Sequence, residues 1–253
     1  MILKVDAKQL EWRSYIYWSQ DKIGMEELWD NVDIHANNMS DLALPNRLIA
    51  KKFIFRKIYL GPPWAYANDS DYSTVSKDVG FWQSVIDKAD AKYYGLHNHQ
   101  KKMLSDAQNK KPIVTPTGRE YLFEPRTKYD GSKEFNVSDI ANWPNQGYAS
   151  DLMILARISL RQRLLKIPEY HQGKVLLMNT VFDDIELDVD NDPDLLYNIS
   201  ILCEKVFEDI PKSFEHVYKT KFNIPMAGEV SFGHRLTEMT EFDQEKGVSQ
   251  FAN

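Results

Sequence analysis

Apolar positions recur with two different periods along the chain, which predicts a fold that contains both strands and helices. Strand-like alternation occurs at residues 2–6 (ILKVD) and in two β-rich runs within residues 174–189 (KVLLMNTVFDDIELDV). These two runs flank Asp183 and Asp184, so they predict a hairpin with carboxylates at its tip. Residues 110–127 alternate on both sides of a Thr-Gly turn and predict a strand, a turn and a second strand.

Helical periodicity covers most of the remaining chain. The helix predicted for residues 46–59 is bounded, because Pro45 interrupts the pattern before it and a Gly-Pro-Pro sequence stops it. A long helix is predicted for residues 137–165, with Pro144 in its first part. The other predicted helices cover residues 9–20, continuing near 25–32, then 78–107 as one or two helices, and 192–210, where Asp192 or Asp194 is a candidate cap.

Composition fits an ordinary soluble globular protein, because 43% of the 253 residues are apolar, enough for a substantial core. No run of about 18 apolar residues exists, and the amino terminus becomes charged too soon for a secretory signal. The single cysteine, Cys203, has no partner for a disulfide or a zinc site, and its simplest role is that of a small buried apolar residue. We therefore expect a cytoplasmic location, prokaryotic or in a host cell, and no membrane partner.

Charge is distributed unevenly, although the net charge is −6. From Leu176 onward there are 16 Asp and Glu against 6 Lys and Arg, whereas the preceding residues contain 21 acids and 25 bases. An acidic end beside a mildly basic remainder is compatible with a metal-binding carboxylate centre near a groove for a polyanion. A solvated acidic face is the commoner cause of such a pattern.

Arg47, Lys51, Phe55 and Tyr59 recur every four residues and form one stripe on the helix predicted for 46–59. The simplest explanation is an amphipathic helix that shows Arg and Lys to water. The functional alternative is a clamp for a nucleotide, in which the two cations bind triphosphate oxygens and the two rings face the sugar and base. The apolar complement that would be buried comprises Leu48, Ile49, Phe53, Ile54 and Ile58.

Asp6 and Asp183 lie far apart in the sequence, and each alone could be a turn or cap residue. If the fold brought them together at strand ends, they would instead hold paired Mg²⁺ ions for phosphoryl transfer.

Four segments stand out for their residue patterns: residues 5–13 (VDAKQLEWR), residues 47–59 with the spacing R-x3-K-x3-F-x3-Y, residues 142–151 (NWPNQGYASD) and residues 181–185 (VFDDI). They resemble the motifs of family A DNA polymerases, in the order that the family has them. The first is similar to D-Y-S-Q-I-E-L-R, with Asp6, Gln9, Glu11 and Arg13 in register, and the second satisfies the fingers-helix motif. The third resembles N-A-P-x-Q-G-x-x-x-D, and the fourth resembles V-H-D-E-I.

The resemblance extends over nearly the whole chain, because three further segments match: 33–35 (DIH), 115–123 (TPTGREYLF) and 224–233 (IPMAGEVSFG). It implies an α+β fold with an antiparallel palm sheet and a helical fingers subdomain, without the thumb and exonuclease domains. Residues 1–32 and 128–240 would form the palm and 33–127 the fingers, followed by a loose tail at 241–253.

The resemblance also implies the roles of particular residues. Asp6 and Asp183 would ligate two Mg²⁺ ions, or Mn²⁺ in their place, with help from the Ala7 carbonyl and with Asp184 as a weaker candidate. Arg47, Lys51 and His35 would bind the dNTP triphosphate, and Lys51 would also donate a proton to the pyrophosphate leaving group. Outside such a motif, His35 would simply be a helix-end residue.

The remaining roles concern the sugar, the base and the DNA. Glu11, beside Tyr59, would be the steric gate against a ribose 2′-OH, and Gln9 also belongs to the implied dNTP site. Phe55 would disfavour a sugar that lacks its 3′-OH, and Tyr59 would stack near the templating base. The implied contacts to primer-template DNA are Arg13, Asn142 and Gln146. Outside the motifs, Glu11 and Gln146 would be ordinary polar residues on helix surfaces.

The sequence departs from the family pattern at four positions. Phe182 replaces a His, Asp184 replaces a Glu, Leu60 replaces a Gly and Ser138 replaces an Arg. The first two changes predict weaker positioning of the primer end and a lower rate. The other two predict altered fingers mobility and an altered contact to the duplex.

The expected function is template-directed DNA synthesis by two-metal nucleotidyl transfer. Since the first motif begins six residues from Met1, we expect the carboxyl-terminal half of a split polymerase, completed by a second polypeptide with the thumb and exonuclease domains, or a fragment of a longer gene product. Viral or phage replication is the setting that the resemblance implies. One alternative is an inactive DNA-binding or accessory remnant, and another is a metal-dependent phosphohydrolase that uses the acids of residues 183–194.

Overall fold

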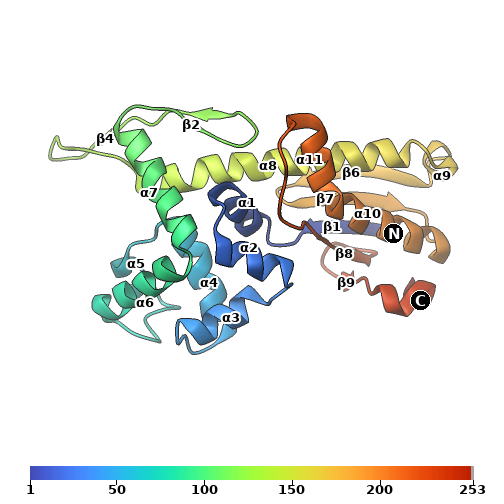
Figure 1. The fold of residues 1–253 in the computed structure, drawn as a ribbon. Coiled ribbons are helices and arrows are strands. Elements are labelled where there is room, and N and C mark those ends of the chain that lie inside the picture. The colour runs from blue at the N-terminus through green and yellow to red at the C-terminus, as the bar shows by residue number, and fades with distance from the viewer. Residues whose placement is uncertain (252–253) are drawn as a thin grey trace. The chain divides into compact units, whose positions relative to one another are not determined.

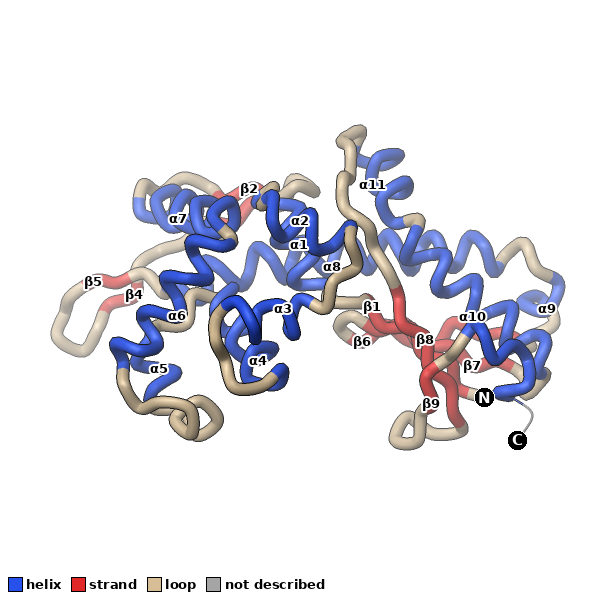
Figure 2. The backbone as a smooth tube through the Cα atoms, turned by 60° about the horizontal axis from the view of Figure 1, so that its bottom comes forward, coloured by secondary structure: helices blue, strands red, loops and turns tan. Residues whose placement is uncertain are grey.

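The computed structural model describes residues 1–251 and contains two compact units. One, the sheet unit, comprises Met1–Leu10 and the chain from Ala149 onward, and the other, the helical unit, comprises Glu11–Tyr148. Figure 1 labels the elements of both units, and Figure 2 colours their strands and helices. Within residues 1–251, no helix combines the length and the apolar character that a membrane span requires.

The sheet unit is built on an antiparallel sheet of five strands in the order β6-β7-β1-β8-β9. The central strand β1 has alternate burial, with Leu3, Val5 and Ala7 buried, so that Lys4 and Asp6 lie on the opposite face. The fold is therefore α+β with an antiparallel sheet, as predicted. The strands are β1 (Ile2–Ala7), β6 (Val175–Val181), β7 (Asp184–Val189), β8 (Gly228–Gly233) and β9 (Thr240–Glu241).

Helix α10 (Pro193–Glu208) covers one face of this sheet, where it packs on β1 and β8. Asp192 caps the helix, because its carboxylate accepts hydrogen bonds at 3.0 Å from the backbone amides of the second and third residues that follow it. Cys203 lies on the buried face of α10, and burial raises the pKa of its thiol to about 12. The other helices wholly within this unit are α9 (Pro168–His171), α11 (Ile210–Tyr218) and the 3₁₀ helix η1 (Gln244–Phe251).

The end of the chain differs from the loose tail predicted for residues 241–253. Phe251, the last residue of η1, is 3% exposed and packs on Phe232 of β8, with the ring centroids 4.4 Å apart. Burial of this aromatic ring holds the segment against the sheet. Residues 252 and 253 lie outside the described part of the chain.

The helical unit has a core of stacked and tilted aromatic rings. Phe53 of α4 lies 5.2 Å from Tyr66 of α5, and Tyr66 lies 5.3 Å from Trp82 of α6, measured between ring centroids. These helices follow one another in the chain: α1 (Leu10–Ser19), α2 (Lys22–Trp29), α3 (Ile34–Asp41), α4 (Arg47–Ile58), α5 (Pro63–Ala67), α6 (Val79–Lys92) and α7 (Tyr94–Gln108).

Two short hairpins complete this unit. The first, from β2 (Ile113–Val114) and β3 (Glu120–Tyr121), confirms the predicted strand–turn–strand. The second pairs β4 (Arg126–Thr127) with β5 (Lys133–Glu134). The long helix α8 (Val137–Leu164), which contains Pro144 as predicted, contributes its first part to this unit and the rest to the sheet unit.

Helix α4 ends in a hydrogen-bond pattern that normally contains glycine. The amide of Leu60 donates to the Lys57 carbonyl at 2.9 Å, and the amide of Gly61 donates to the Arg56 carbonyl at 3.0 Å. This Schellman pattern requires a left-handed residue after the C-cap, and Leu60 has a φ of 57°. The departure from Gly at this position therefore keeps the geometry of the helix end and adds steric strain.

Replacing Leu60 with Gly should relieve that strain. We expect Leu60→Gly to unfold with a free energy about 1 kcal/mol higher than Leu60→Ala, because both variants lose the side chain but only Ala keeps the left-handed penalty. Urea denaturation followed by circular dichroism would measure the difference. Equal midpoints for the two variants would contradict it.

Candidate functional site

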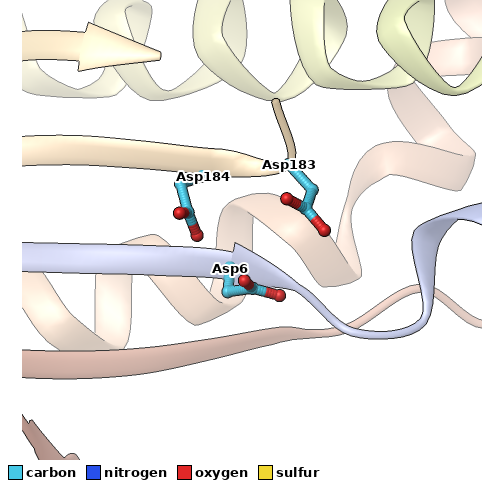
Figure 3. Close-up of side chains that lie close together, drawn as sticks. All are labelled: Asp6, Asp183 and Asp184. Atoms are coloured by element: carbon cyan, nitrogen blue, oxygen red, sulfur yellow. The ribbon is translucent and has the colours of Figure 1, made fainter. Parts of the chain in front are cut away.

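Three aspartates meet at the end of the paired strands β1 and β7. Asp6 and Asp184 are register partners in the sheet, and the Asp183 carbonyl accepts a hydrogen bond of 3.0 Å from the Ala7 amide. One carboxylate oxygen from each of Asp6, Asp183 and Asp184 lies within 4.8 Å of the others. Figure 3 shows Asp183 and Asp184 directed from the β6–β7 hairpin toward Asp6 on β1. The hairpin with carboxylates at its tip is as predicted.

Burial and the two neighbouring carboxylates change the pKa of Asp6. The pKa of Asp6 rises to about 7, first because the group is partly buried, then because its protonated form hydrogen-bonds to Asp184, and then because Asp183 is nearby. Lys4 opposes this effect, and its ammonium lies 2.8 Å from Asp184 Oδ2. The hydrogen bond to Asp184 is the main reason that the pKa of Lys4 is raised.

This group fits a divalent metal ion. Asp184 Oδ1 is buried and accepts no hydrogen bond from any residue in the described chain, which leaves a lone pair available to a cation. Carboxylate oxygens are the ligands that Mg²⁺ and Mn²⁺ prefer, and a bound cation would offset the repulsion among the three acids. Asp6, Asp183 and Asp184 could therefore hold a metal, with the Ala7 carbonyl as a further oxygen.

Phe182 occupies the first position of the two-residue turn between β6 and β7. It has a φ of 53° and is 93% exposed, so its ring contributes nothing to the core. Hairpin turns with a positive φ at this position favour glycine, and an exposed phenylalanine there is strained. Phe182 directly precedes Asp183 in the chain and lacks the hydrogen-bonding capacity of a histidine.

In the helical unit, the four-residue stripe begins at the first residue of α4. Asn46 caps the helix by accepting a hydrogen bond of 2.9 Å from the amide of the third residue beyond it. Arg47 and Lys51 are exposed, whereas Phe55 and Tyr59 are partly buried. The opposite face is buried as predicted, with one exception: Leu48 is 59% exposed.

Asp33 holds the side chain of Arg47. Asp33 belongs to the DIH segment at residues 33–35, and the resemblance to the polymerase family implied no role for it. Arg47 Nε donates to Asp33 Oδ2 at 2.7 Å, and this hydrogen bond is the main reason that the pKa of Asp33 falls to about 2. Asp33 also caps α3 by accepting from the amides of His35 and Ala36. The same carboxylate therefore fixes the start of α3 and the direction of the Arg47 side chain.

His35 lies close to these groups but is buried, with 4% of its surface exposed. Burial lowers its pKa to about 4, and the charge of Arg47 lowers it further, so the imidazole is neutral at pH 7. Its Nδ1 has no hydrogen-bond partner within residues 1–251, and its ring centroid lies 6.2 Å from that of Phe55. His35 can therefore offer a hydrogen bond to a ligand, but not a positive charge.

Glu11 and Tyr59 also meet within the helical unit. Burial raises the pKa of the Tyr59 hydroxyl, and the nearby Glu11 carboxylate raises it further. Gln146 Nε2 lies 3.5 Å from Glu11 Oε1, and Asn145 Nδ2 donates to the Glu11 carbonyl at 3.1 Å. Asn145 is fully buried and accepts a hydrogen bond of 2.8 Å from Ser14, so it joins α1 to α8. In the sequence, the only indication of a role for Asn145 was its position within the NWPNQG segment.

The remaining predicted site residues come from the first and third motifs and differ in how far they are exposed to solvent. Arg13 is 3% exposed, so α1 does not offer it freely to a duplex. Asn142 is partly buried, and its side-chain oxygen has no hydrogen-bond partner in the described chain. Gln9, which follows β1, has a φ of 52°. Of the predicted DNA contacts, Gln146 is the most exposed.

The chain matches known proteins over most of its length. The family described as "DNA polymerase family A" matches residues 1–238. Two curated relatives, the proteins called DNA polymerase I in Helicobacter pylori strains J99 and 26695, are 27% and 25% identical over 214 and 209 residues. Each alignment covers 81% of this chain and 23% of the relative, so the chain spans about a quarter of the length of these proteins.

A solved structure has a similar fold. It is described as the POL domain of Pol1 from M. smegmatis in complex with DNA primer-template and dNTP. The TM-score is 0.71 at 15% sequence identity, and the match covers 92% of this chain and 39% of that one.

Proposed function

Because the chain belongs to DNA polymerase family A, we propose that it catalyses template-directed DNA synthesis by nucleotidyl transfer from a dNTP to a primer 3′-OH. The observation that carries the proposal is the meeting of Asp6, Asp183 and Asp184 at one end of β1 and β7. Asp6 and Asp183 are distant in sequence and match the metal-binding positions of two separate motifs, and Asp184 stands where the family has a Glu.

In this proposal, Asp6 and Asp183 hold two divalent ions, Mg²⁺ or Mn²⁺, with help from the Ala7 carbonyl. Such ions activate the attacking hydroxyl and stabilise the leaving oxygen in an in-line displacement. Two strands place the carboxylates: Asp6 comes from the centre of the sheet, and Asp183 comes from a hairpin tied to β1 by the Ala7 amide. The hydrogen-bonded sheet would hold these proposed ligands near one another before a metal binds.

The exposed cations of α4 are proposed to bind the dNTP. Arg47, oriented by Asp33, would contact triphosphate oxygens, and Lys51 would protonate the pyrophosphate leaving group. His35 would donate a neutral hydrogen bond, and the Phe55 ring would lie against the sugar. Gln9 is proposed to complete the dNTP site from the end of β1.

Glu11 and Tyr59 are proposed to exclude ribonucleotides, and the contacts of Glu11 with Asn145 and Gln146 would hold it in place. Arg13, Asn142 and Gln146 are proposed to contact the primer-template. We propose the palm at residues 1–32 and 128–240 and the fingers at 33–127.

Removing the Glu11 side chain should weaken sugar discrimination. We expect Glu11→Ala to raise the efficiency of ribonucleotide incorporation relative to deoxyribonucleotide by roughly 100-fold, because the group that would crowd a 2′-OH is gone. Single-nucleotide incorporation with matched rNTP and dNTP would measure the ratio. Glu26→Ala removes an exposed glutamate from α2 and serves as the control. The same ratio in both variants would argue against the gate.

The proposal includes a second polypeptide that carries a thumb domain. A thumb supplies many of the phosphate contacts on which DNA affinity rests. The chain covers 23% of its relatives and 39% of the matched structure, so the relatives contain much that this sequence does not. We therefore expect weak binding of primer-template by the purified chain and stronger binding with the partner.

Primer extension by the purified chain tests the function, in Mg²⁺ and in Mn²⁺, with and without a thumb-bearing polypeptide. Template-dependent extension under any of these conditions supports the polymerase. DNA binding without extension would support the alternative of an inactive remnant, which the strained Phe182 and the Lys4–Asp184 ion pair favour. Release of phosphate or nucleotide without a template would favour the phosphohydrolase. That alternative gives no role to the stripe of four residues on α4.

A further inference from the structure

Lys4 places a positive charge at the carboxylate group, and none of the four polymerase motifs includes this residue. Its Nζ lies 2.8 Å from Asp184 Oδ2, and the side chains of Lys4 and Asp184 are 29% and 17% exposed. Lys4 and Asp6 are two residues apart on one strand, so their side chains lie on the same face of the sheet. Asp184 is the register partner of Asp6, and the ion pair therefore crosses diagonally from β1 to β7.

An ion pair that is partly exposed to water commonly contributes little to stability. This pair differs because its acid is one of three carboxylates that lie within 4.8 Å of one another. A metal ion that approaches Asp184 meets an ammonium already bound to one of its two oxygens. The other oxygen, Oδ1, is buried and has no partner among residues 1–251.

We propose that Lys4 is a positioning residue that occupies Asp184 and lowers the affinity of the carboxylate group for divalent cations. The proposal rests on the proposed function, in that the same carboxylates are taken to be the metal site. Lys4 reduces the negative charge that a metal experiences and directs the metal toward Asp6 and Asp183. Repulsion between the Lys4 ammonium and a cation on the same carboxylate group would be strong, although partial exposure to water would screen it.

Binding of Mn²⁺ to the purified chain, without DNA or nucleotide, tests the proposal and does not depend on activity. The signal of free Mn²⁺ in electron paramagnetic resonance would give the dissociation constant. We expect Lys4→Met to bind Mn²⁺ about tenfold more tightly than the wild type, and Lys4→Arg to bind within about twofold of it, because the charge is retained.

A matched control removes a lysine from an ion pair of the same length elsewhere in the sheet unit. Lys205 lies 2.8 Å from Glu208 on α10, and Lys205→Met should leave Mn²⁺ affinity unchanged. If Lys4 acts by occupying Asp184, Lys4→Met should have a smaller effect in an Asp184→Asn background than in the wild type. Lys4→Gln provides a second neutral variant in case Lys4→Met does not fold.

Unchanged or weaker Mn²⁺ binding in both neutral variants would overturn the proposal, as would an equal gain in Lys205→Met or no Mn²⁺ binding by any variant. The proposed function fails on a different measurement. If the chain extends no primer with any partner but Lys4→Met still binds Mn²⁺ more tightly, the polymerase activity is rejected while the role of Lys4 holds.

Discussion

Replacing Asp183 with Asn should reduce template-dependent primer extension by about 1,000-fold or more, equivalent to about 4 kcal/mol of activation free energy. The neutral amide keeps the size of the side chain but loses the negative charge that would hold the metal ions. The fold should persist, because the contact of residue 183 with Ala7 uses a backbone carbonyl, which the substitution leaves in place. Extension of a labelled primer in Mg²⁺, measured with enzyme in excess, would give the rate of the chemical step.

Asp188→Asn is the matched control for that experiment. Asp188 lies on the same strand β7, but its side chain is 55% exposed and it is not one of the three clustered carboxylates. We expect it to extend primers at close to the wild-type rate. A rate for Asp183→Asn within tenfold of the wild type would exclude two-metal catalysis by this group.

Replacing Lys51 with Met should lower kcat/KM for dNTP by about 100-fold to 1,000-fold, since the proposed proton donor and the proposed phosphate contact would be lost together. Part of the loss should appear in kcat, because protonation of the leaving group stabilises the transition state specifically. Single-nucleotide incorporation at varied dNTP concentrations would separate kcat from KM.

Lys52→Met provides the comparison, because it changes the adjacent lysine of the same helix. Lys52 forms an ion pair with Asp71 and lies off the stripe. Its replacement should change kcat/KM only slightly. Equal losses of kcat/KM in the two variants would mean that the total charge of α4 matters and that Lys51 has no specific role.

Local sequence patterns predicted the helices and strands better than they predicted which strands pair. The alternation in residues 174–189 and the Asp-Asp pair identified the β6–β7 hairpin, because strand period and turn are both local properties. The register that places Asp6 opposite Asp184 joins strands far apart in sequence and depends on tertiary packing. The predicted continuation of the first helix to about residue 32 was broken by a local feature. Gln20 has a φ of 53°, and the next residue, Asp21, caps a new helix.

The candidate site was predicted through motifs, and its supporting residues were largely missed. Asn145 contacts α1, which is far away in sequence, and Asp33 contacts Arg47 on the next helix. Both contacts depend on how the helices pack, which no local pattern encodes. Lys4 could have been found, because a strand that starts at residue 2 places Lys4 and Asp6 on one face. The burial of Arg13 was not foreseen, because α1 carries apolar residues on nearly all sides and does not indicate which face is exposed.

The burial of Cys203 under the sheet has a practical use. A fully buried thiol whose pKa is raised to about 12 forms little thiolate at neutral pH and reacts slowly with maleimides. A cysteine introduced at an exposed position in each unit could thus carry a fluorescent dye while the native cysteine is kept. Energy transfer between such dyes would test whether the distance between the two labelled positions changes when primer-template DNA and dNTP are added.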